Sequence, residues 1–126
     1  MSISNYLEGK LLDQVFFNTT FPNITAVFGS LHTADPTETG TGSPLASTPR
    51  MAIVFNAQAS STSVNATAVT WTCSATGTIT HMALWDASST ATANCLWYGA
   101  LTASKVVANV GDTVQLTSGS LAVSLD

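Results

Sequence analysis

Apolar side chains recur every three or four positions over the first part of the chain, between residues 3 and 16. They are Ile3, Tyr6, Leu7, Leu11, Leu12, Val15 and Phe16. This i, i+3, i+4 spacing predicts an amphipathic helix over residues 1–18. Ser2 or Ser4 can cap its start, and Pro22 predicts that it ends near Asn18. The pattern leaves open whether the apolar stripe packs on its own domain or on a neighbouring subunit.

The pattern then changes to short runs rich in β-branched and aromatic residues, separated by Gly, Pro, Asn and Ser. The runs are 24–32, 50–56, 64–74, 78–86, 94–101, 105–110, 112–118 and 120–126. Gly111 and Gly119 mark tight turns between the last three runs. Seven or eight short strands with a turn about every ten residues predict an all-β fold: an antiparallel β-sandwich, jelly-roll or Ig-like, with one N-terminal α-helix.

The chain of 126 residues is the length of a single domain, 1–126, with a real hydrophobic core. The strand runs supply large apolar side chains that we expect in the sandwich interior: Ile53, Phe55, Val69, Trp71, Leu84, Trp85, Leu96 and Trp97. Cys73 and Cys95 lie in the same apolar runs. Because no export signal precedes them, buried free thiols are favoured over a disulfide.

Charged residues make up only 8% of the chain, and the net charge is −4. The fixed cations Lys10, Arg50 and Lys105 are scattered, so binding to nucleic acid or to anionic membranes is not expected. No run approaches the roughly 20 apolar residues of a membrane span, and synthesis in a cytoplasm is the default expectation. A surface of Thr, Ser, Ala and Asn suits a protein held against neighbours, although an ordinary β domain with solvated threonines would have the same composition.

The connector that follows the first strand, residues 33–49, is long for a compact domain and contains "ADPTETGTG". Turn-forming residues dominate it, and long connectors of this kind usually bind something. We therefore predict an extended interaction loop that projects from the sandwich and contacts other subunits. Its candidate contact residues are His32, Asp35, Pro36, Thr37, Glu38, Gly40, Gly42 and Arg50.

The same residues could carry other chemistry. His32, Asp35 and Glu38 at i, i+3, i+6 could hold a metal, but zinc and calcium sites usually show denser ligand patterns. No nucleophile motif, phosphate-binding loop or paired carboxylates can be assigned. We expect no catalytic residues, no cofactor and no metal. Exposed aromatic residues on the strands would instead suit a carbohydrate-binding module, a more remote alternative.

Several stretches, taken in order, resemble a family of small tailed-bacteriophage virion proteins labelled as tail-fibre or capsid-associated proteins. They are "LLDQVF", "LHTADPTETGTGSP" followed by Arg50, "THMALWDASS", "LWYGALTASKVVANVGDTVQL" and "GSLAVSLD". The resemblance covers about residues 11–126. Two positions depart from the family pattern: Ser43 follows the Gly-x-Gly where an acidic residue is expected, and Thr48 replaces an aromatic residue before Arg50.

The resemblance implies a non-enzymatic structural protein of the virion, made in the bacterial cytoplasm. Small size and the absence of heptads or fibrous repeats favour a capsid decoration (cement) protein over a complete tail fibre. Its expected partners are then the major capsid protein, or another virion protein, and its own copies in a homotrimer. The alternative within the same class is a component of the tail tip, baseplate or tail fibre.

Overall fold

The N-terminal apolar stripe forms the helix α1 (Asn5–Phe17) in the computed structural model, which describes residues 1–89 and 91–125. Ser4 is the N-cap, and its hydroxyl oxygen accepts a hydrogen bond from the Leu7 amide at 3.3 Å. Asn18 ends the helix in the left-handed conformation. The helix begins later than predicted because Ser2–Ile3 form a short strand, β1, that pairs with Tyr98 and Trp97.

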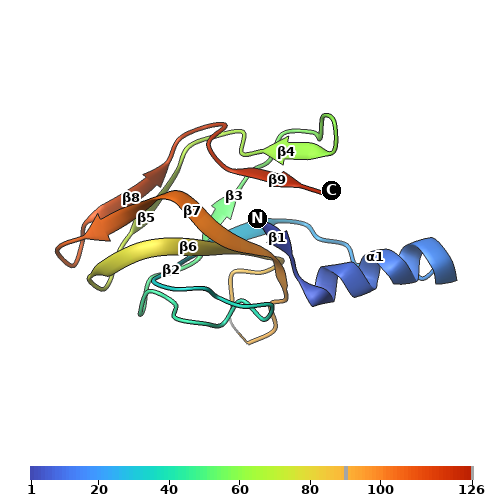
Figure 1. The fold of residues 1–126 in the computed structure, drawn as a ribbon, viewed down its shortest axis with the longest axis horizontal. Coiled ribbons are helices and arrows are strands. Elements are labelled where there is room, and N and C mark those ends of the chain that lie inside the picture. The colour runs from blue at the N-terminus through green and yellow to red at the C-terminus, as the bar shows by residue number, and fades with distance from the viewer. Residues whose placement is uncertain (90, 126) are drawn as a thin grey trace.

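The remaining strands confirm the predicted all-β sandwich and pair in antiparallel fashion (Figure 1). One sheet has five strands in the order β1-β7-β6-β2-β3, with β7 (Cys95–Val107), β6 (Gly77–Trp85), β2 (Val27–His32) and β3 (Met51–Ile53). Two further antiparallel pairs, each formed by strands far apart in the sequence, complete the fold. They are β4 (Thr62–Val64) with β9 (Ala122–Ser124), and β5 (Val69–Thr72) with β8 (Thr113–Leu116).

Two strand predictions need correction. The run 64–74 is divided between β4 and β5, because the buried Asn65 side chain donates to the Thr67 and Thr117 carbonyls and accepts from the Leu121 amide. These bonds turn the backbone between the two strands. The run 94–101 and the first half of the run 105–110 instead join in the single strand β7, which ends at Val107. The last residue of the predicted run 120–126 lies outside the described residues.

The main core lies between the five-stranded sheet and the β5–β8 pair, and Trp71 is its central side chain. Trp71 is fully buried, and its indole N–H donates to the Gly29 carbonyl at 3.0 Å. A Cβ on Gly29 would lie 2.9 Å from the Trp71 ring and 2.6 Å from Ile53. Glycine at this position therefore lets the indole pack directly against β2. Ile53, Val69, Trp71 and Leu84 lie in this core, and Leu96 is also buried, as predicted. Phe55 and Trp97 are half-buried, and Trp85 lies outside this core, in a second cluster.

A second, smaller cluster lies on the other face of the five-stranded sheet. Ala83, Trp85 and Cys95 are buried there, with Phe28 and Tyr98 packed beside them. The sheet is therefore covered on both faces. The β5–β8 pair covers one face, and the connector 33–49 covers the other. Both cysteines are buried free thiols, as predicted. No helix in the described part of the chain is long and apolar enough to span a membrane.

Candidate functional site

The connector 33–49 is the covering layer over this second cluster. The Leu45 amide donates to the Leu31 carbonyl and the Thr33 amide to the Ser43 carbonyl, both at 2.9 Å. Pro36 and Gly40 are buried, and Leu45 is buried in the main core. The prediction that this segment projects from the sandwich as an arm is wrong, because its glycines and prolines fold it back on the sheet. Its role in contacts with other subunits stays a prediction.

Gly40 is the point where the loop lies closest to the sheet. Its φ of +70° is in the left-handed region, and a Cβ would lie 2.6 Å from the Trp85 ring and 2.9 Å from the Cys95 sulfur. Both the backbone conformation and the space require glycine. Glycine at position 40 thus reflects packing against Trp85, whereas a Cβ on Gly42 would instead lie 2.5 Å from the Asp35 carbonyl oxygen.

His32 ties the loop to the sheet through a chain of buried hydrogen bonds. Its Nδ1 lies 2.6 Å from the Gly42 carbonyl oxygen and its Nε2 lies 2.7 Å from the Ser30 hydroxyl. Because a carbonyl only accepts, Nδ1 carries the proton and Nε2 accepts from Ser30. The Trp85 indole N–H donates to the same hydroxyl at 2.8 Å. Burial lowers the pKa of His32, so the neutral ring that this network needs is favoured.

Arg50, which directly follows the connector, contacts Trp85 and the turn after β6. Its guanidinium lies 3.5 Å from the centroid of the Trp85 ring, a cation–π contact. It also donates to the Ala87 carbonyl at 3.2 Å and to the Ser89 carbonyl at 3.1 Å. Arg50 therefore links the end of the connector to the turn that follows β6.

Glu38 joins the loop to the N-terminal helix. Its carboxylate accepts from the Asn5 amide at 3.0 Å and from the Tyr98 hydroxyl at 2.5 Å. The bond to Glu38 raises the pKa of Tyr98 to about 12. The first turn of α1 is thus held both by Glu38 and by the capping residue Ser4, whose hydroxyl donates to the Cys95 carbonyl.

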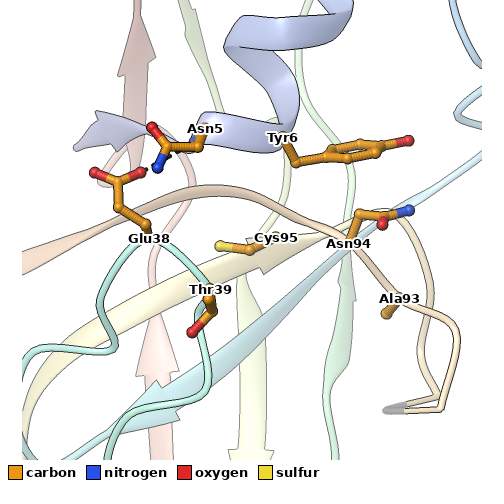
Figure 2. A pocket seen from close by; sticks show the side chains of 7 residues that line it. All are labelled: Asn5, Tyr6, Glu38, Thr39, Ala93, Asn94 and Cys95. Atoms are coloured by element: carbon orange, nitrogen blue, oxygen red, sulfur yellow. Dashed lines mark hydrogen bonds between the residues drawn. The ribbon is translucent and has the colours of Figure 1, made fainter.

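A hollow of about 250 Å³ opens at this junction, between the first turn of α1, the loop and the start of β7 (Figure 2). Its lining residues are Asn5, Tyr6, Glu38, Thr39, Ala93, Asn94 and Cys95. Burial raises the pKa of the Cys95 thiol to about 12, which keeps it protonated. Asn94 is held by the Asp86 carboxylate, which accepts from its side chain at 2.7 Å. The hollow offers polar contacts but no activated nucleophile.

The structure separates the candidate metal ligands His32, Asp35 and Glu38. Asp35 accepts from the Thr37 amide at 2.9 Å, in a local turn, while His32 and Glu38 bond to the partners described above. No three His, Cys, Asp or Glu residues among those described cluster as a metal site would require. Trp85 lies beneath Arg50 and Gly40 and is only 4% exposed, so it offers no exposed face for stacking on a sugar.

One side of helix α1 forms an exposed apolar surface. Helix α1 extends away from the sandwich (Figure 1), and only its first turn is anchored, through the buried Leu7. Leu12, Val15 and Phe16 are 55%, 71% and 72% exposed. At i, i+3 and i+4 they form one face, which we call the free face of α1. The sequence pattern identified these residues but could not separate them from the side of the helix that packs on the domain, because Leu7, Leu11 and Val15 follow one another at i+4 and make the neighbouring side apolar too.

Comparison with known proteins gives one family over almost the whole chain. The family model described as "Podophage GP4 fiber I protein gp80" matches residues 2–124. A search of curated proteins found no match.

Proposed function

Since the chain belongs to the podophage GP4 fiber I protein gp80 family, which is a family of phage virion structural proteins, we propose that it is a non-enzymatic building unit of the tail fibre. The family description agrees with the tail alternative of the sequence analysis. It does not agree with the role that the sequence favoured, that of a capsid decoration protein. Contacts with other virion proteins and with its own copies follow from this role, and the homotrimer stays a prediction.

The observation that carries the proposal is the free face of α1. An apolar helix face held out from the body of a domain exposes surface that water solvates poorly. Burying it against a neighbour gains roughly 25 cal/mol for each Å² of apolar area removed from water. A helix anchored only by its first turn is therefore suited to joining subunits.

The remaining polar groups support a structural role rather than catalysis. Ser30 and His32 are a hydroxyl and an imidazole within hydrogen-bonding distance, as in nucleophile–base pairs. Here both are buried and bond to Trp85 and Gly42, so they fix the loop. The thiol of Cys95 is protonated and covered by Gly40.

The test is the location and copy number of the protein in purified virions. We expect quantitative mass spectrometry to give a copy number close to that of known tail proteins, and antibody labelling to mark the tail in electron micrographs. A copy number close to that of the major capsid protein, with label over the head, would overturn the fibre assignment and support capsid decoration. Absence from purified virions would overturn both.

A further inference from the structure

A second feature lies on the sandwich: a groove of about 370 Å³ between β7 and the ends of β8 and β9, lined by apolar side chains together with polar ones such as Thr102, Gln115 and Ser120. Leu101 and Ala103 of β7 line one wall, and Leu116, Leu121 and Ala122 line the other. We call this the β7 groove. It lies on a different part of the molecule from the hollow at the start of α1, and nothing in the described residues fills it.

The groove lies beside an irregularity in the pairing of β6 with β7. Ile79 pairs with Lys105 and His81 with Ala100, so residues 101–104 of β7 lie opposite a single residue of β6. β1 covers the other edge of β7 only at Trp97 and Tyr98. In the described chain this edge therefore has no strand partner beyond residue 98. An uncovered edge beside an apolar wall is a site where another chain segment can pack.

The free face of α1 matches the β7 groove in charge as well as in polarity. On that face the charged residue is Glu8, one turn before Leu12. Among the groove-lining side chains the charged one is that of Lys105. Glu8 and Lys105 are both exposed. Packing the helix into the groove would place opposite charges at the rim and apolar side chains at the centre, the usual arrangement of a protein interface.

We propose that the free face of α1 in one copy docks in the β7 groove of the next copy. This inference rests on the proposed function and names the partner. Leu12, Val15 and Phe16 remain exposed in the chain that carries them, so the helix does not occupy its own groove. A helix on one part of the molecule that fits a groove on another makes a heterologous contact. Repeated head to tail, such a contact closes into a ring or extends into a filament.

Two single variants and their mixture test this arrangement on the purified full chain. Phe16→Asp places a charge on the free face of α1, and Ala103→Glu fills the β7 groove with a charge. Both positions are exposed, so the fold should persist, and circular dichroism with thermal melting checks it. Ala122→Glu is a second groove variant in case Ala103→Glu does not fold. Val110→Asp is the matched control, since Val110 is 68% exposed and lies in neither surface.

Light scattering after size-exclusion chromatography should show concentration-dependent oligomers for the wild type and the Val110→Asp control. Phe16→Asp and Ala103→Glu should each be monomeric. Their mixture should give a one-to-one dimer and nothing larger, because only the helix of the Ala103→Glu chain and the groove of the Phe16→Asp chain remain competent.

Three results would overturn the inference. They are a wild type that is monomeric at every concentration, an Ala103→Glu variant that assembles like the wild type, and a mixture that stays monomeric. The second result would point to helix-to-helix association, and the first to a different virion protein as the occupant. None of them changes the copy number or labelling that tests the fibre assignment, so the two proposals fail separately.

Discussion

Trp71 connects the two layers of the sandwich through one fully buried side chain. Its ring packs between β2 and the β5–β8 pair, and its N–H bonds to Gly29. Trp71→Ala should lower the free energy of unfolding by about 3–5 kcal/mol, because large core truncations leave a cavity. Urea denaturation measures the change. Val110→Ala, at an exposed position, should change it by less than about 0.5 kcal/mol, and an equal loss in both variants would argue against this core.

Gly40 and Gly119 form a natural pair for separating backbone strain from packing. Both have a left-handed φ, +70° and +76°, but only Gly40 has side chains within the reach of a Cβ. Gly119→Ala should cost about 1–2 kcal/mol from the backbone conformation alone. Gly40→Ala should cost more, because it also displaces Trp85. If thermal or urea unfolding showed the same loss of stability for both variants, the connector would not pack against Trp85 in solution.

His32 should make stability depend on pH. Burial lowers its pKa in the folded protein, so the unfolded chain takes up a proton first as the pH falls. Stability is therefore complete above the unfolded pKa of about 6.5 and decreases as the pH falls below it, until the folded pKa is reached. His32→Gln should flatten this part of the curve in urea titrations between about pH 7.5 and pH 5. An unchanged slope would contradict the burial of His32.

At the scale of elements, the hydrophobic pattern was sufficient for the helix, for most strands and for the large core residues. It was insufficient for the connector 33–49. Gly, Pro and Thr carry no periodic apolar signal, so the cover that they form over Trp85 depends on contacts such as Gly40 to the indole and His32 to Gly42. A sequence pattern does not show which residue of the connector meets which residue of the sheet, so these contacts could not be predicted.

A folded connector and a mobile arm predict opposite rates of amide hydrogen exchange. The amides of Thr33, Gly42 and Leu45 donate to backbone carbonyls. They should therefore exchange hydrogen slowly in the isolated monomer, for which the Phe16→Asp variant is suited. Gly40→Ala should speed exchange over residues 33–45 and leave β5 and β8 unchanged. Rapid exchange of the connector in the monomer would restore the arm as the better description.

At the scale of the whole molecule, the proposed assembly links stability to concentration. A partner that binds only the folded chain raises the melting temperature as its concentration rises. The wild type should therefore melt at increasing temperature as the protein is concentrated, while Phe16→Asp should melt at one temperature throughout. Differential scanning calorimetry over a wide concentration range makes the comparison, and identical behaviour of the two proteins would count against self-association.

The two free thiols lie in different layers, and this makes partial opening separable from complete unfolding. Cys95 is covered by Gly40 of the connector, whereas Cys73 belongs to the main core. Neither is accessible in the folded state. A pulse of alkylating reagent should therefore modify Cys95 whenever the connector lifts, and Cys73 only when the sandwich itself comes apart. Peptide masses from one sample would then report two opening rates, with no label introduced into the chain.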